Sequence, residues 1–128
     1  MNIRIAGQED AQRIIEWSFA NREANDLDPD VLNYPLTEIF CAENGKPLGY
    51  LPAQLAAVLE SFAPNPEATE QEKNAALYGL TDAIVETAAN KGIKEIYFIG
   101  SNEEVNAFAE RLGFKRIDLP VYRLKVGK

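Results

Sequence analysis

The stretch that decides the fold is TEQEKNAALYGLTDAIVETAANKGIKEIYFIGSNEEVNAFAERLGF, residues 69–114. It predicts a long helix, a short strand and a second helix. Thr69 with Glu72 three residues on has the spacing of a capping box, which starts the first helix. Gly92 ends that helix, and Gly113 ends the second in the same way, because glycine readily takes the backbone conformation that closes a helix.

The apolar residues of this unit predict where it is buried. Residues 93–100 are predicted to form a strand, and their apolar run at residues 96–99 is typical of a strand covered on both faces. The second helix is predicted to be capped by Ser101 or Asn102. The first helix is expected to bury one stripe of side chains, formed by Ala76, Leu77, Leu80, Ile84 and Ala88.

Upstream, a short strand is predicted over residues 1–6 and a helix over residues 7–23, followed by a short helical turn around Val31 and Leu32. A hairpin with arms at residues 36–42 and 47–52 comes next. Its turn contains Asn44 and Gly45, which both tolerate the positive φ that a tight turn needs.

Residues 55–62 are ambiguous, because alanine, leucine and glutamate favour a helix. We predict a third strand of the same meander, since the segment continues the hairpin and ends before Pro64. The tail, residues 114–126, is predicted to form two short strands separated by Pro120.

This order of elements predicts one α+β domain over residues 1–128. A hairpin-rich first half that leads into a strand–helix–strand unit favours a mixed, mostly antiparallel central sheet of about six or seven strands, with about four helices on its faces.

Composition narrows the function classes. The 128 residues include 20 acidic and 13 basic ones, for a net charge of −7, and this balance disfavours nucleic-acid binding. There is no histidine, which removes the commonest general base and metal ligand, so no metal site is expected. Cys41 is the single cysteine and is predicted to be a buried apolar residue. Without a signal peptide or a membrane-length apolar run, a cytoplasmic protein is expected.

The second half resembles the GNAT superfamily of N-acetyltransferases. In that family a Q/R-x-x-G-x-G/A loop opens the long helix, and Gln71 and Ala76 match it, with Asn74 in place of the first glycine. Asn102, Phe108 and Gly113-Phe114 match the family's later helix. The family's tyrosine, seven residues after the asparagine, is replaced by Ala109.

The resemblance implies acetyl-CoA as acyl donor and an acyltransferase site. Small residues at a helix N-terminus let phosphates approach unpaired N–H groups. The three nearby glutamates and the capping box fit equally well with an ordinary acidic helix start that binds no phosphate. The implied acetyl-CoA-binding residues are Phe62, Ala63, Gln71, Glu72, Lys73, Asn74, Ala75, Ala76, Asn102 and Phe108.

Without histidine, a carboxylate is the natural base, and Glu60 lies at the end of the predicted third strand, where family members often carry a glutamate. A solvent-facing position explains Glu60 equally well. The N–H groups of Phe62 and Ala63 would polarise the thioester carbonyl. The residues expected to line the acceptor side, or else to be core, are Trp17, Phe19, Tyr34 and Tyr50. Acidic residues that could attract a cationic acceptor are Glu23, Asp26 and Asp28.

The sequence therefore predicts an acetyl-CoA-dependent N-acetyltransferase acting on a primary amine of a small molecule or a protein, with no nucleic-acid or membrane partner. A homodimer is left open. The alternative is a catalytically inactive GNAT-fold binding or interaction module with weak or no CoA binding, which Asn74 and Ala109 would suit. For the proton donor to the thiolate, the candidate hydroxyls are Tyr78, Tyr97, Ser101 and Tyr122.

Overall fold

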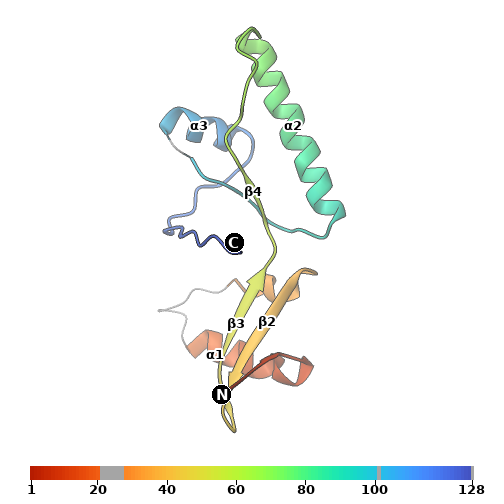
Figure 1. Ribbon diagram of the computed structural model, residues 1–128, viewed down its shortest axis with the longest axis vertical. Coiled ribbons are helices and arrows are strands. Elements are labelled where there is room, and N and C mark those ends of the chain that lie inside the picture. Colours follow the sequence, from red (N-terminus) through yellow and green to blue (C-terminus); the bar gives the residue numbers. More distant parts are fainter. Residues whose placement is uncertain (21–27, 101, 128) are drawn as a thin grey trace.

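The computed structural model describes residues 1–20, 28–100 and 102–127. Glu23, Asp26 and Ser101 lie outside these ranges. The elements are, in order, β1 (Asn2–Ile5), η1 (Gln8–Asp10), α1 (Ala11–Ala20), η2 (Pro29–Asn33), β2 (Thr37–Glu43), β3 (Pro47–Gln54), β4 (Ala57–Leu59), α2 (Glu70–Asn90), β5 (Ile96–Phe98) and α3 (Glu103–Arg111). They form two lobes, which we call the sheet lobe (residues 2–54) and the crossover lobe (residues 57–112); they lie at opposite ends of the long axis in Figure 1.

The sheet lobe is built on an antiparallel sheet with strand order β1-β2-β3. The predicted hairpin is confirmed, with its turn at residues 44–46. Gly45 has φ 73°, and the Asn44 N–H donates to the Lys46 carbonyl at 2.9 Å, which closes the turn. The predicted first strand and the helical turn around Val31 are confirmed as β1 and η2.

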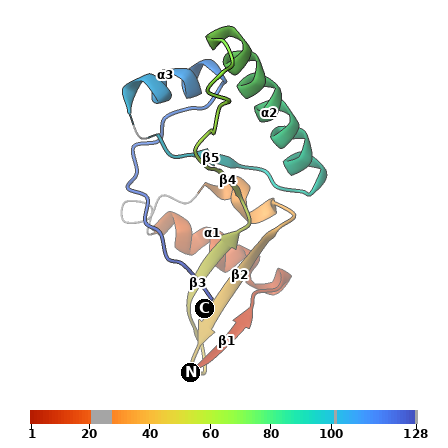
Figure 2. The ribbon, with the colours of Figure 1, turned by 45° about the horizontal axis from the view of Figure 1, so that its top comes forward.

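One face of this sheet is covered by η1 and α1, which lie behind the strands in Figure 2. Cys41 is fully buried there, as the sequence predicts, and Ile14 of α1 is buried as well. Phe19 is exposed and does not belong to the core.

The crossover lobe contains the parallel pair of β4 and β5, joined by α2. The prediction that residues 55–62 continue the meander is wrong, because β4 pairs with β5 rather than with β3. The ladder of β2 and β3 ends at the pair Thr37 and Gln54. Beyond this pair, Pro35 has no N–H with which to extend β2. The chain that follows β3 therefore pairs with β5 instead.

Helix α2 begins and ends as predicted. Thr69 is its N-cap in a capping box, and Gly92 follows its last turn with φ 82°. The predicted buried stripe is largely wrong. Ala88 is buried, but Leu80 and Ile84 are exposed, because α2 lies away from the larger sheet.

Helix α3 also has its predicted bounds, with Asn102 as N-cap and Gly113 at φ 98° after its end. The tail differs from prediction, since residues 114–127 contain no strand. Pro120 has no N–H to donate to a ladder, and the large apolar residues from Ile117 to Val126 are exposed.

The α+β class is confirmed, whereas the size and form of the sheet are corrected. The described residues hold five strands and three α-helices with two short 3-10 helices, not six or seven strands and four helices. The strands form two separate sheets rather than one mixed sheet. Among the described residues, no helix has the length and apolar character needed to cross a membrane.

Candidate active site

The crossover lobe places two helix N-termini after the carboxyl ends of two parallel strands. β4 pairs with β5 through Ala57–Ile96 and Leu59–Phe98. The chain leaves β4 at Glu60 and enters α2 ten residues later, and it leaves β5 at Phe98 and enters α3 after Asn102. In parallel α/β units, anionic ligands bind at this end, because helix N–H groups point there.

The N-terminus of α2 is partly occupied by its own capping box. The Thr69 N–H donates to the Glu72 carboxylate at 2.9 Å, and the Glu72 N–H donates to the Thr69 hydroxyl at 3.1 Å. The Thr69 N–H lowers the pKa of Glu72. Of the four N–H groups that a helix start leaves unpaired, those of Glu70 and Gln71 remain for a ligand.

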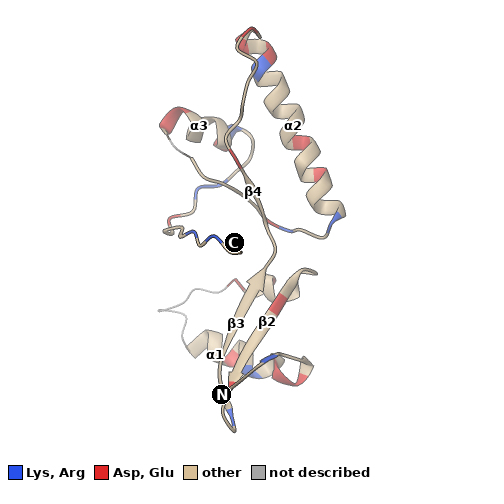
Figure 3. Cartoon of the chain, viewed as in Figure 1, with Lys and Arg blue, Asp and Glu red and all other residues tan. Residues whose placement is uncertain are grey.

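The charge around this helix start is negative, as the red segments at the beginning of α2 show in Figure 3. Glu70 and Glu72 lie in the first turn, and Glu67 precedes it. Lys73 is the nearby cation, and its ammonium donates to the Glu70 carboxylate at 3.3 Å. A bound phosphate would compete with Glu70 for Lys73.

The remaining loop residues are solvent-accessible. Gln71, Asn74, Ala75 and Ala76 are all exposed on the first two turns of α2. A helix repeats about every 3.6 residues, so Gln71 and Asn74 lie on the same side of α2 as Tyr78. This side is open to solvent at its N-terminal end.

The segment after β4 holds the predicted catalytic base. Glu60 directly follows Leu59, the last residue of β4, and is exposed. Phe62 and Ala63 are exposed on the extended segment beyond it, and Pro64 lacks an N–H. A row of backbone donors along this segment therefore ends at Ala63.

The side chain of Phe108 joins α3 to α2. Its ring packs against Tyr78 with centroids 5.4 Å apart at 53°, and the Arg111 guanidinium lies over it at 5.1 Å. The Asn102 side chain accepts from the Val105 N–H at 2.9 Å, so it serves as a helix cap. Phe108 thus fixes α3 against the side of α2 that carries Gln71 and Asn74.

The structure distinguishes among the hydroxyl groups that the sequence offers as proton donors to the thiolate. The Tyr97 hydroxyl donates to Glu95, which raises the pKa of Tyr97 to about 12. The same hydrogen bond lowers the pKa of Glu95. Tyr122 is exposed in the tail. Tyr78 is the candidate whose ring packs against Phe108. In the sequence, Tyr78 follows Gln71 by seven residues, which is two helical turns, and this spacing could have indicated that both lie on the same side of the helix.

The aromatic residues predicted for the acceptor side lie mainly in the sheet lobe. Trp17 packs against Tyr50 with ring centroids 5.4 Å apart. The Tyr50 hydroxyl donates to Asp10 at 2.7 Å and accepts from Arg13 at 2.9 Å. These contacts belong to the packing of α1 on the sheet, so Trp17 and Tyr50 act as core residues.

Asp10 is the centre of that network. Its carboxylate accepts from Arg4 at 2.8 and 2.9 Å and from the Gly7 N–H at 2.9 Å, and it is fully buried. The hydrogen bonds from Arg4, Tyr50 and Gly7 hold the pKa of Asp10 well below its usual range.

Asp28 has a separate local role, because it caps η2 through the Asp30 N–H. Tyr34 stands apart from this network, because it is the Glu95 carboxylate that raises the pKa of Tyr34.

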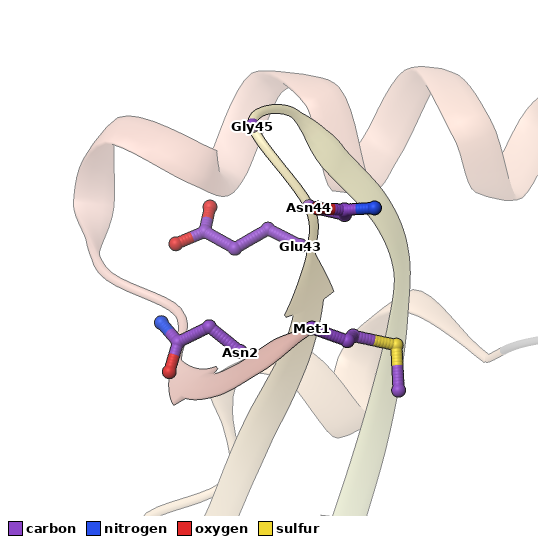
Figure 4. Close-up of a pocket in the computed structure, with 5 residues that line it drawn as sticks. All are labelled: Met1, Asn2, Glu43, Asn44 and Gly45. Atoms are coloured by element: carbon purple, nitrogen blue, oxygen red, sulfur yellow. The ribbon is translucent and has the colours of Figure 1, made fainter.

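A pocket of about 410 Å³ lies at the tip of the hairpin, in the sheet lobe. Met1, Asn2, Glu43, Asn44 and Gly45 line it, as Figure 4 shows. Its carboxylate, Glu43, already accepts from Arg4 at 3.0 Å, and neither a nucleophile nor a general base besides Glu43 is present. The helix N-termini of the crossover lobe therefore remain the candidate site. In residues 1–20, 28–100 and 102–127, no three acidic or cysteine side chains gather as metal ligands would.

These features define an α+β chain with a parallel crossover unit that presents helix N-termini. No protein-family model matches the chain, and no curated protein sequence matches it. Among solved structures it is similar to a predicted acetyltransferase from Clostridium acetobutylicum with acetyl-CoA, at 13% identity and a TM-score of 0.43, covering 96% of this chain and 95% of that one. It is also similar to an aminoglycoside N-acetyltransferase, AAC(6')-Iy, in complex with CoA, at 17% identity and a TM-score of 0.44, covering 98% and 100%.

A likeness at these TM-scores carries no argument about activity. The function proposed below therefore rests on the residues of this chain alone.

Proposed function

We propose that the chain is an acetyl-CoA-dependent N-acetyltransferase that transfers an acetyl group to a primary amine. The observation that supports it is the start of α2 after the carboxyl end of β4, with Phe108 of α3 packed against the same side of α2. This arrangement presents N–H donors to an anion and leaves the adjoining strand end free for chemistry.

In this proposal the N–H groups of Glu70 and Gln71 bind the pyrophosphate of CoA. Lys73 leaves Glu70 and neutralises one phosphate charge. The bulk of Asn74 and the charge of Glu72 oppose this binding, so affinity is expected to be weaker than that of a glycine-rich loop with basic neighbours.

Acyl transfer would take place along the segment after β4. The Glu60 carboxylate takes a proton from the acceptor ammonium, and the free amine nitrogen attacks the thioester carbonyl carbon. The N–H groups of Phe62 and Ala63 hold the carbonyl oxygen as it becomes negative. The carbon–sulfur bond then breaks, and the Tyr78 hydroxyl protonates the departing thiolate. The nitrogen of the new amide loses its second proton through water, which returns a proton to Tyr78.

Calorimetric titration with acetyl-CoA and with CoA tests the binding step. The Glu72→Gln variant makes this binding test more specific, because glutamine retains the hydrogen bonds of the capping box while removing one negative charge. We expect this variant to bind CoA several-fold more tightly than the parent chain. Glu86→Gln, on the last turns of α2, removes the same charge far from the helix start and should leave affinity unchanged.

An acyl-transfer assay with small amines and with a lysine peptide tests the chemistry. Glu60→Gln is expected to lower kcat at least about 100-fold with CoA affinity retained, as for loss of a general base. Full activity in this variant would exclude Glu60 as the base. No binding at millimolar acetyl-CoA would overturn the proposal and leave the alternative, an inactive interaction module of the same fold.

A further inference from the structure

Asn106 of α3 lies beside the end of β5, next to the strand end proposed for acyl transfer. The ladder of β4 and β5 ends at the pair Leu59 and Phe98, and Gly100 follows Phe98 by two residues. The segment that leaves β4 runs between α2 and α3 in Figures 1 and 2. The Asn106 N–H donates to the Asn102 carbonyl at 3.0 Å, which fixes the residue in the first turn of α3.

The side chain of Asn106 lies against the backbone of Gly100. A Cβ atom at residue 100 would lie 1.5 Å from Asn106 Oδ1 and 2.6 Å from its Cγ, so the amide occupies the place of a side chain. Asn106 Nδ2 would be 3.3 Å from the same Cβ and therefore points away from Gly100. A Cα–H group attracts an oxygen weakly, which suits this orientation of the amide.

The amide of Asn106 is unpaired and accessible. Asn102 uses its side-chain oxygen to accept from the Val105 N–H at 2.9 Å, whereas the Asn106 amide has no hydrogen-bond partner within residues 1–20, 28–100 and 102–127. Asn106 is half-buried, but its amide is not among the described polar atoms that are sealed from solvent. Nδ2 therefore has two hydrogen atoms that it can donate to a ligand.

The charges around Asn106 favour an uncharged acceptor over a phosphate. Glu103 and Glu104 lie in the same turn of α3. Two carboxylates repel a phosphate, whereas a carbonyl oxygen carries only a partial negative charge. Acetyl-CoA has such oxygens in the arm that joins its pyrophosphate to its thioester, because this arm contains amide groups.

We propose that Asn106 binds this arm of acetyl-CoA, with Nδ2 donating to an amide carbonyl oxygen, and that Gly100 positions the Asn106 amide. The contact rests on the proposed function, because it takes acetyl-CoA as the ligand. There the pyrophosphate binds at the start of α2 and the thioester lies beside Phe62 and Ala63, so the arm passes the strand end that Gly100 follows. Asn106 is a binding residue and takes no part in proton transfer.

Calorimetric titration with CoA and with 3′-phospho-ADP tests this contact, because the second ligand has the pyrophosphate but lacks the arm. Asn106→Ala is expected to weaken CoA binding about three- to tenfold, as for the loss of one uncharged hydrogen bond, and to leave 3′-phospho-ADP binding unchanged. Asn106→Asp should weaken CoA binding further, because a carboxylate has no proton to donate. Asn90→Ala, at the exposed end of α2, is the matched control and should bind CoA like the parent chain.

Gly100→Ala tests the positioning role. The φ angle of Gly100 is not positive, so alanine suits the backbone there, and its methyl group must displace the Asn106 amide. We expect Gly100→Ala to weaken CoA binding about as much as Asn106→Ala does. Added to Asn106→Ala, it should weaken binding no further, because both changes act on one contact. Melting temperatures within about 2 °C of the parent chain would show that the variants remain folded.

The possible outcomes separate the role of Asn106 from the proposed function. If the parent chain binds CoA and Asn106→Ala binds it equally well, the contact is overturned and acetyl transfer is not. An equal loss of CoA and 3′-phospho-ADP binding also overturns it, because Asn106 would then act through the fold or at the phosphates. Additive losses from Gly100→Ala and Asn106→Ala contradict the positioning role of Gly100. A parent chain that binds no CoA overturns the proposed function and the contact together.

Discussion

The sheet lobe and the crossover lobe are held together by contacts of different range. In the sheet lobe, the Tyr50 hydroxyl reaches Asp10 across 40 residues of sequence, and Arg13 reaches Tyr50 across 37. In the crossover lobe, the side-chain hydrogen bonds at the starts of α2 and α3 are helix caps that span three residues, at Thr69 and Asn102. Long-range contacts make the first lobe cooperative, whereas short-range contacts define helices without fixing where they pack.

Burial follows the same division. Among the described residues, each lobe buries three, but the one large apolar side chain among them is Ile14 of the sheet lobe, beside Asp10 and Cys41, whereas the crossover lobe buries Thr81, Ala88 and Ala109. Substitutions should therefore destabilise the sheet lobe more than the crossover lobe. The predictions below test this difference, from the largest expected effect to the smallest.

Replacing Asp10 by alanine should have the largest effect. It leaves the Gly7 N–H and the Tyr50 hydroxyl without their shared acceptor and leaves Arg4 with Glu43 as its remaining partner, and removing one partner of a buried ion pair strongly destabilises a fold. We expect the melting temperature, followed by circular dichroism, to fall by roughly 10 °C or more. Asp82→Ala, at an exposed position of α2, is the control. An equal effect of the two variants would contradict the importance of the network.

The Asp10 carboxylate should also make the stability of the fold depend on pH in the acidic range. Its pKa is lowered in the folded chain, so it contributes stability above the unfolded pKa of about 4, and this contribution is lost as the pH falls below that value. Melting temperatures measured between neutral pH and pH 2 should show the loss in the parent chain. Asp10→Asn should show a shallower decline over the same interval.

Replacing one isoleucine by alanine in each lobe compares the packing of the two lobes directly. Ile14→Ala removes a buried side chain and is expected to lower the free energy of unfolding by about 2 to 4 kcal/mol. Ile84→Ala, on the exposed side of α2, is expected to cost less than about 1 kcal/mol. Urea denaturation measures both. A loss at Ile84 as large as that at Ile14 would indicate that α2 is packed in solution.

Removing the cap of α2 should have a smaller, local effect. Thr69→Ala removes the hydroxyl that accepts from the Glu72 N–H, and it is expected to destabilise the helix by about 1 kcal/mol. Thr69→Ser keeps the hydroxyl and should be close to neutral. The helical circular dichroism signal during urea denaturation distinguishes the two, and equal stability of both variants would exclude a contribution from the cap.

An effect similar in size to that of the helix cap is expected from Tyr97, and it depends on alkaline pH. Tyr97 has its pKa raised to about 12 by its hydrogen bond to Glu95, above the ordinary value of 10.0. Because its folded pKa is raised, its contribution is complete below pH 10 and is lost as the pH rises towards 12. Tyr97→Phe should be less stable by about 1 kcal/mol at neutral pH. A parent chain and a variant that lose stability identically above pH 10 would argue against this hydrogen bond.

The sequence predicted the candidate site in part. Glu60, Gln71 and Asn102 are placed by signals that act within a few residues, and in the structure Glu60 follows β4, Gln71 lies in the first turn of α2 and Asn102 is the N-cap of α3. The contact of Tyr78 with Phe108 was not predicted, because it joins two helices 30 residues apart. Their roles in acetyl transfer stay predictions.

By itself, the sequence determined the α+β class, the hairpin turn at Gly45 and the starts and ends of α2 and α3. These depend on local backbone chemistry: capping hydroxyls, glycines with positive φ, and apolar periodicity. Only the tertiary structure decided that β4 leaves the meander to pair with β5, that the strands form two sheets, and that Asp10 lies buried between Arg4 and Tyr50. Such pairings depend on which distant segments meet, and local pattern does not encode the partner.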